Sequence, residues 1–114
     1  MAVRIATSNP RGLLDSINSA IADGSIKTWS VDADGDFTHT PDQWRLKAWL
    51  RPTLGNGILR LNIIAPRGTE LSALTYAVYH GRFIEMVLNH FDRQFSEASA
   101  SALPEPGDII KPPA

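Results

Sequence analysis

Residues 48–65 read AWLRPTLGNGILRLNIIA and contain the strongest short hairpin signal in the chain. Asn56 and Gly57 readily adopt the positive φ that a tight two-residue turn requires at both central positions. Pairing outward from this turn matches apolar residues with apolar residues, in the pairs Leu54–Leu59, Leu50–Ile63 and Ala48–Ala65. The sequence therefore predicts two antiparallel strands. Regular pairing is expected to end at Pro52, which cannot donate a backbone hydrogen bond.

A second hairpin is predicted directly before this one along the chain. Residues 33–35 form a three-residue loop if Gly35 takes the left-handed conformation that such loops require. This loop sets bulky side chains opposite each other in two pairs, Val31–Phe37 and Trp29–His39. The two flanking strands then show the same alternation of apolar and polar residues as the later hairpin.

A proline turn is predicted to join the two hairpins. Pro41 is the second residue of the segment 40–43, where its fixed φ favours a β-turn. A two-residue connection at this turn gives the pairs Phe37–Leu46 and His39–Trp44. All three turns then agree on one apolar face of a four-stranded antiparallel meander. This agreement fixes the register, because a slip of one residue would invert a whole strand.

The predicted register divides the side chains between two faces of the sheet. The inner face holds Trp29, Val31, Phe37, Trp44, Leu46, Ala48, Leu50, Leu59, Leu61 and Ile63. The outer face holds Thr28, Ser30, Thr38, Arg45, Lys47, Trp49, Arg51, Arg60, Asn62 and Ile64. The inner face is almost wholly apolar, as expected of a sheet with one face packed on a core.

One helix is predicted before this meander in the chain and one after it. The first begins at Pro10 with Asn9 as its N-cap and ends near Gly24. The second is expected from about Glu70 to Glu97, with Thr69 as its N-cap. Its core face is predicted to be the stripe that alternates three and four residues apart: Leu74, Ala77, Gly81, Ile84, Leu88, Phe91 and Phe95.

The predicted fold class is α+β: a helix, a four-stranded antiparallel meander and a long C-terminal helix, with both helices on one face of the sheet. A chain of 114 residues is long enough for one hydrophobic core. Residues 1–97 are predicted to form a single α+β domain. Residues 98–114 are rich in Ser, Ala and Pro and are predicted to be a flexible tail.

The second helix carries another apolar stripe, formed by Tyr76, Tyr79, Phe83, Met86 and His90. This stripe lies roughly 150° around the helix from the predicted core face, at about 100° per residue. Either the first helix covers it or a second copy of the chain does. Aromatic and Met side chains are enriched at interface centres, so we expect these five residues to form a homodimer interface.

The outer sheet face is a possible nucleic-acid-binding surface. Residues 43–69 contain five basic residues and no acidic one. Four of these cations share the predicted outer face with Trp49, a possible stacking platform: Arg45, Lys47, Arg51 and Arg60. The alternative is that these charges only solvate an open sheet face, while Trp49 and Ile64 form a cross-strand pair.

The composition limits the classes of function. A formal net charge of −1 argues against a generally basic nucleic-acid binder, and the absence of Cys excludes disulfides and thiolate sites. No apolar run reaches the roughly 18 residues of a membrane span, and residues 1–9 lack the apolar segment of a signal peptide. The sequence therefore predicts a cytoplasmic protein that does not bind membranes.

The sequence offers no recognisable catalytic residues, metal site or cofactor site. Asp32, Asp34 and Asp36 resemble a calcium loop, but the sixth and twelfth positions lack the Gly and Glu that such a loop needs. The three aspartates are therefore interpreted as a solvated hairpin tip, at most a weak cation site. His39, His80 and His90 do not share one spacing that would gather them on a metal.

These observations predict a small, non-enzymatic, self-associating, protein-binding module without a cofactor. Nucleic-acid binding through the outer sheet face is the first alternative. A small enzyme whose site is assembled only in three dimensions is the second.

Overall fold

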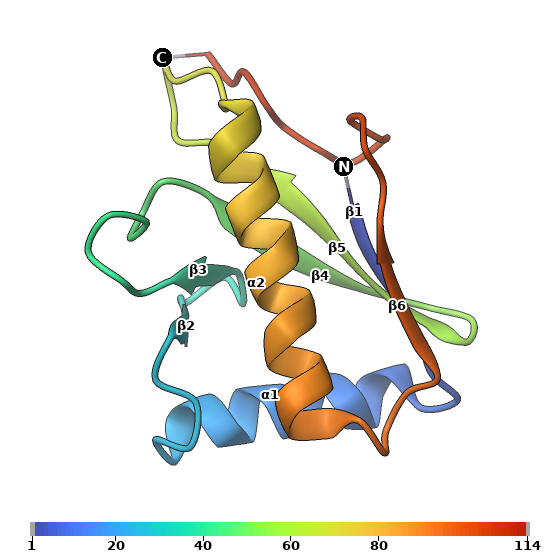
Figure 1. Ribbon diagram of the computed structural model, residues 1–114. Helices are drawn as coiled ribbons and strands as arrows, with labels where there is room; N and C mark the ends of the chain where they lie inside the picture. Colours follow the sequence, from blue (N-terminus) through green and yellow to red (C-terminus); the bar gives the residue numbers. More distant parts are fainter. Residues whose placement is uncertain (1, 114) are drawn as a thin grey trace.

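The Asn56–Gly57 turn joins the two central strands, β4 (Trp49–Gly55) and β5 (Ile58–Ile64), in the computed structural model (Figure 1). The structure describes residues 2–113. Gly57 has a φ of 72°, which residues with a side chain rarely adopt. The predicted register is confirmed, with the cross-strand pairs Leu54–Leu59, Leu50–Ile63 and Trp49–Ile64.

Strand β4 runs through Pro52, so the prediction that pairing ends there is wrong. Pro52 lies opposite Leu61, and the strand continues to Gly55. Donor and acceptor groups alternate in direction along an antiparallel strand. Counted from the two-residue turn, the nitrogen of Pro52 points away from β5. On that side β3 (Phe37–His39) pairs with β4 only through Phe37 and Leu50, so no hydrogen bond is lost.

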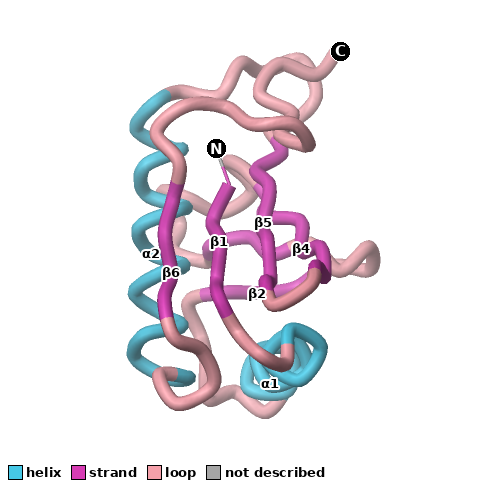
Figure 2. The backbone as a smooth tube through the Cα atoms, turned by 90° about the vertical axis from the view of Figure 1, so that its right-hand side faces the viewer, coloured by secondary structure: helices cyan, strands magenta, loops and turns pink. Residues whose placement is uncertain are grey.

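The sheet has six antiparallel strands in the order β2-β3-β4-β5-β1-β6. Strands β2 (Trp29–Val31) to β5 form the meander, and its first hairpin has the predicted pairs Val31–Phe37 and Trp29–His39. Strands β1 (Ala2–Ala6) and β6 (Glu97–Ala100) extend the sheet beyond β5, as Figure 2 shows. The predicted four strands are therefore two short of the observed sheet.

Strand β1 is the main element that the sequence prediction missed. Val3 and Ile5 alternate with Arg4 and are fully buried, opposite Leu61 and Leu59 of β5. This two-residue alternation was a usable strand signal, although only five residues carry it. Strand β6, with the sequence EASA, has no such apolar alternation and is ordered by its pairing with β1.

Residues 98–113 do not form the predicted separate tail. After β6 the chain returns to the sheet, where Asp108 Oδ1 accepts hydrogen bonds from Asn62 Nδ2 at 2.8 Å and from the Ile63 nitrogen at 3.2 Å. Ile109 forms a parallel bridge with Ile64 of β5. The pairing of β1 with β5 extends to the Ala2–Asn62 pair, so Ile109 lies beside β5 next to the end of that pairing. Paired backbone therefore compensates for a composition that offers few side chains to bury.

The connection between β3 and β4 also differs from the prediction. Phe37 pairs with Leu50 rather than with Leu46, and residues 40–48 form a loop instead of a tight turn. The nitrogens of Trp44 and Arg45 donate to the Pro41 carbonyl at 2.8 and 2.9 Å, which closes a helix-like turn.

The hydroxyl of Tyr79 holds this connection in place. Tyr79 Oη donates to the carbonyl of Trp44 and lies 3.1 Å from Thr38 Oγ1. Thr38 Oγ1 in turn donates to the Ala48 carbonyl at 3.0 Å and accepts from the Leu46 nitrogen at 3.2 Å. Leu46 has a φ of 59°, a left-handed conformation that costs a leucine about 1–2 kcal/mol. These contacts offset that cost.

Both helices lie close to their predicted starts. Helix α1 (Pro10–Ala22) begins after Asn9, whose Oδ1 accepts from the Gly12 nitrogen at 3.0 Å, as predicted. Helix α2 (Ala73–Phe91) begins after Ser72, three residues later than expected, because Ser72 Oγ accepts from the Thr75 nitrogen at 3.1 Å. It ends at Phe91 rather than near residue 97, and the chain there turns into β6.

The predicted assignment of the faces of α2 is wrong. The buried face carries Tyr76, Tyr79, Phe83 and Met86, the stripe that was predicted to bind a second chain. Leu74 and Leu88 of the predicted core stripe are instead 65% and 53% exposed. Side-chain size explains the choice: aromatic rings bury more apolar area than the alanine and glycine of the other stripe, which would leave voids over the sheet.

Helix α2 lies across the sheet, and α1 lies crosswise to α2 at one end of that helix (Figure 1). Side chains of both helices and of the sheet form one hydrophobic cluster, which includes Leu13, Ile17, Leu50, Leu61 and Phe83. Neither helix within residues 2–113 combines the length and apolarity needed to span a bilayer.

We predict that Tyr79→Phe lowers the free energy of unfolding by about 1–3 kcal/mol, because it removes a donor from a buried hydrogen-bond network. Tyr76→Phe is the matched control. The Tyr76 hydroxyl is buried on the same helix face without a hydrogen-bond partner among the described residues, so its removal should cost nothing. Urea denaturation measures both values, and equal losses for the two variants would contradict the role given to Tyr79.

We predict that Asp108→Ala lowers the free energy of unfolding by about 1–3 kcal/mol, because it removes the carboxylate that accepts hydrogen bonds from Asn62 Nδ2 and from the Ile63 nitrogen. Asp15→Ala, at an exposed position of α1, is the control and should change little. Thermal denaturation compares the two. A melting temperature that is the same for Asp108→Ala and the native chain would show that residues 98–113 are the flexible tail of the sequence prediction.

Candidate functional site: a groove beside helix α2

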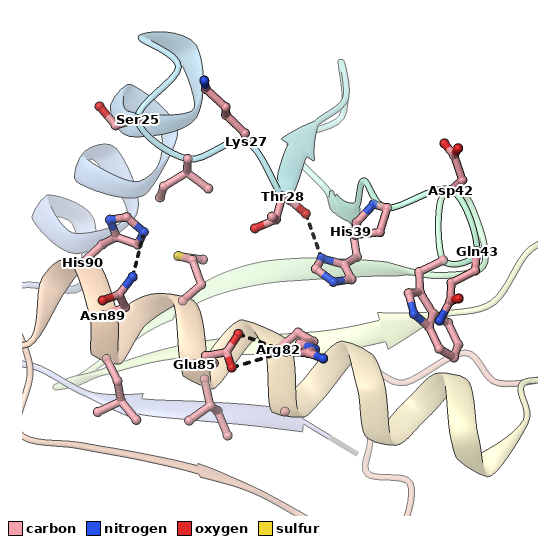
Figure 3. Close-up of a pocket in the computed structure, with 17 residues that line it drawn as sticks. Ser25, Lys27, Thr28, His39, Asp42, Gln43, Arg82, Glu85, Asn89 and His90 are labelled. Carbon is pink, nitrogen blue, oxygen red and sulfur yellow. Dashed lines mark hydrogen bonds and ion pairs between the residues drawn. The ribbon is translucent and has the colours of Figure 1, made fainter.

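A groove with a volume of about 1430 Å³ lies between α2 and the β2–β3 edge of the sheet. Figure 3 shows its three walls. Residues 25–28 come from the α1–β2 connection, residues 41–44 from the β3–β4 connection, and residues 81–90 from α2. The β3–β4 connection contributes one wall of the groove because it is a loop rather than the predicted tight turn.

Apolar side chains form much of the groove surface. Ile26 and Met86 are buried at its base, and Trp44 and Ile84 are half-buried in its walls. Leu88 also lines the groove and is 53% exposed. Trp44 is held at this place through its carbonyl, which accepts the hydrogen bond from Tyr79.

His39 is the one strongly buried polar side chain among the groove residues, with 5% of its surface exposed. Its Nδ1 lies 2.7 Å from the carbonyl oxygen of Thr28 (Figure 3). A carbonyl only accepts, so Nδ1 carries the proton and Nε2 of the neutral ring is the acceptor. Burial lowers the pKa of His39, the Thr28 carbonyl opposes this shift, and the ring is neutral at pH 7.

Charged side chains of both signs lie along the groove. Arg82 Nη1 lies 3.3 Å from both carboxylate oxygens of Glu85, one turn further along α2. The charge of Arg82 lowers the pKa of His39 and that of Glu85 raises it, so the pair lies within electrostatic reach of the ring. Lys27 and Asp42 add one charge of each sign on the opposite walls. The groove thus has no excess of either charge.

This arrangement offers a few polar contacts to a bound ligand. His39 can accept one hydrogen bond from a ligand, and the Arg82–Glu85 pair can exchange hydrogen bonds with polar groups at the rim. An apolar surface with a few polar groups is the usual character of a binding site.

The predicted interface residues do not form an exposed patch. Tyr76, Tyr79 and Phe83 are part of the core, and Met86 is buried at the base of the groove. His90 is exposed and lines the groove. The prediction of a dimer interface through this stripe is therefore wrong, because the chain's own sheet covers it, whereas self-association by another surface is untouched by this finding.

The predicted nucleic-acid-binding residues are divided between two places. Arg45 and Lys47 lie in the β3–β4 connection, because the sheet register there differs from the predicted one. Arg51 and Arg60 lie on β4 and β5 together with half-buried Trp49. Arg51 is committed to Asp36, whose carboxylate accepts from its Nε at 3.1 Å and from its Nη2 at 2.9 Å. The structure therefore does not gather the predicted cations on one sheet face, and nucleic-acid binding stays a prediction.

No family model, curated protein or solved structure matches this chain.

The aspartates at the tip of the β2–β3 hairpin form a cluster in which the carboxylate oxygens of Asp32, Asp34 and Asp36 lie within 4.8 Å of one another. Asp32 Oδ1 accepts from the nitrogens of Asp34 and Asp36, each at 2.9 Å. These contacts cap the loop, and the carboxylate of Asp36 is bound to Arg51. The cluster agrees with the interpretation as a hairpin tip.

The sequence prediction missed the groove, since it assigned Leu88 and Ile84 to the core and treated Pro41 as part of a tight turn. The available signal was the size of the side chains on the two faces of α2. The length of the β3–β4 loop has no comparable signal, because it depends on a hydrogen bond from Tyr79, which lies 35 residues along the chain from Trp44.

We predict that His39 titrates below its ordinary pKa of about 6.5 and that ¹⁵N-detected NMR shows the proton on Nδ1 of the neutral ring. Because the pKa of His39 is lower in the folded state than in the unfolded state, this residue contributes stability at a pH above its unfolded-state pKa. That stability is lost as the pH falls through its folded-state pKa. The unfolding free energy should therefore fall below about pH 6.5, and this component of the slope should be absent in His39→Gln. An Nε2–H tautomer would contradict the assignment.

Proposed function

We propose that this chain is a small, non-enzymatic, protein-binding module that receives an apolar polypeptide segment in the groove beside α2. The observation that carries the proposal is the exposure of Leu88 beside Ile84 and Trp44, on a helix whose other face already supplies the core. Exposed apolar side chains that line one depression are typical of interaction sites. A single leucine elsewhere on the surface would need no such explanation.

The size of the groove favours a polypeptide over a small molecule. Pockets for small ligands usually enclose about 300–1,000 Å³, whereas this groove exceeds that range at about 1430 Å³ and is open along α2. An amphipathic helix laid in a groove uses apolar side chains three and four residues apart as anchors. The apolar residues of α2 that line the groove, Gly81, Ile84 and Leu88, have the matching spacing of three and four residues.

The charges favour a protein over a nucleic acid. Lys27 and Arg82 are accompanied by Asp42 and Glu85 along the groove. A phosphate backbone requires an excess of positive charge, which these residues do not provide. A polypeptide segment can meet charges of both signs with side chains of its own, and His39 Nε2 offers an acceptor for one of its N–H or O–H groups.

We predict that selection of a phage-displayed library of random 16-residue peptides on the native protein enriches amphipathic sequences, and that Leu88→Glu weakens their binding at least tenfold. A carboxylate in the apolar wall would lose its hydration on ligand binding. Fluorescence anisotropy of the enriched peptides measures the dissociation constants of both proteins.

The matched control is Leu103→Glu, which makes the same replacement at a leucine that is exposed outside the groove. It should leave peptide binding unchanged. The proposal fails if no peptide is enriched, or if the enriched peptides bind Leu88→Glu and the native protein equally well.

A further inference from the structure

The exposed face of α2 carries a continuous apolar stripe, which we call the outer stripe: Leu74, Ala77, Gly81, Ile84 and Leu88. Its members are three and four residues apart, so they lie along one side of the helix. Leu74 and Leu88 at its two ends are 65% and 53% exposed. The middle of the stripe is made of small residues, and the ends are large.

Gly81 at the centre of the stripe faces open space. A Cβ placed there would meet no atom within 4 Å, so packing inside the molecule does not require glycine. Glycine is also a poor helix former. A glycine in the middle of a helix allows the backbone of another segment to approach closely, and the space above Gly81 is open for such an approach.

A second copy of α2 fits this stripe when the two helices are antiparallel. In a pair centred between residues 82 and 83, Ile84 lies at the height of Gly81 of the second copy. Leu88 lies at the height of Ala77 of the second copy. The two-fold axis repeats both contacts, so large side chains meet small ones at four positions. Ile84 and Leu88 of each copy would thus fill the space that a small residue of the other copy leaves.

The charges beside the stripe match under the same two-fold axis. Arg82 lies within about 3 Å along the axis of Glu85 of the second copy, at a rise of about 1.5 Å per residue. These side chains are 56% and 67% exposed and form an ion pair within each chain, so they can also pair across the interface. A parallel arrangement would instead set Arg82 beside Arg82 and Ile84 against Ile84.

We propose that the polypeptide received beside α2 is the α2 helix of a second copy of this chain, in an antiparallel two-fold dimer centred between residues 82 and 83. This inference rests on the proposed function, since it names the partner for the same surface. Ile84 and Leu88 of each copy pack over Gly81 and Ala77 of the other, and Arg82 and Glu85 pair across the axis.

Gly81→Gln tests the close approach at the centre of the pair. Glutamine is a better helix former than glycine, and the side chain enters open space in the monomer, so the fold should be at least as stable. In the dimer the same side chain occupies the space of Ile84 of the second copy. We expect light scattering to give about 25 kDa for the native protein, twice the 12.5 kDa of the chain, and the dimer dissociation constant to rise at least tenfold in the variant.

The control is Ser19→Gln, which adds the same side chain at an exposed position of α1 and should leave the dimer intact. Thermal denaturation of Gly81→Gln confirms that loss of the dimer is not loss of the fold. A dimer that persists unchanged in Gly81→Gln would place the interface elsewhere and overturn the proposal.

Charge reversal tests the antiparallel pairing. Glu85→Arg leaves two cations beside the stripe and Arg82→Glu leaves two anions, so each variant alone should dimerise at least tenfold more weakly. A mixture of the two should recover a mixed dimer, because each cation then faces an anion of the other copy. Failure of the mixture to associate would contradict the pairing.

The two proposals can fail separately. A native protein that stays near 12.5 kDa at every concentration tested, yet binds the selected peptides through Leu88, excludes the second copy as the partner and retains the binding module. A monomer that binds no peptide overturns both. A dimer lost in Gly81→Gln and recovered in the mixture of charge variants supports both.

Discussion

The hydrogen bond from the Tyr79 hydroxyl to the Trp44 carbonyl is the constraint on which the rest of the structure depends. It ties the buried face of α2 to the β3–β4 connection. It also holds residues 40–48 away from the sheet as a loop. That loop becomes one wall of the groove, so the same bond sets the core packing and the shape of the candidate site.

The sequence predicted the parts of the fold that depend on local turn chemistry. The Asn56–Gly57 and Gly35 turns gave the correct cross-strand pairs, because the backbone conformation of a short turn sets the register of the strands beside it. The predicted tight turn at Pro41 is wrong, because the hydrogen bond from Tyr79 to the Trp44 carbonyl holds this segment as a longer loop. Strands β1 and β6 were not predicted, because β1 has only five residues and β6 has no apolar alternation.

The candidate site illustrates a different limit. Helix α2 has two apolar stripes, and periodicity alone does not say which one a sheet will cover. The outer stripe has the more regular spacing, but Ala77 and Gly81 cannot fill the space over a curved sheet that Tyr79 and Phe83 fill. Volume outweighs regularity in a close-packed interior. The stripe left outside is the surface for which we propose a partner.

Strand β1 lies between β5 and β6, so the first residues of the chain are bonded to residues made much later. Ala2 donates to Ser101, which is 99 positions away. Closing so large a loop is entropically costly and slows folding when many contacts depend on it. On the ribosome the β2–β5 meander can pair as it emerges. The apolar side chains of Val3 and Ile5 stay uncovered until their partner strand β5 has been synthesised. The sheet is therefore completed only after β6 has been synthesised, and until then the free edge of β1 is open to pairing with other chains.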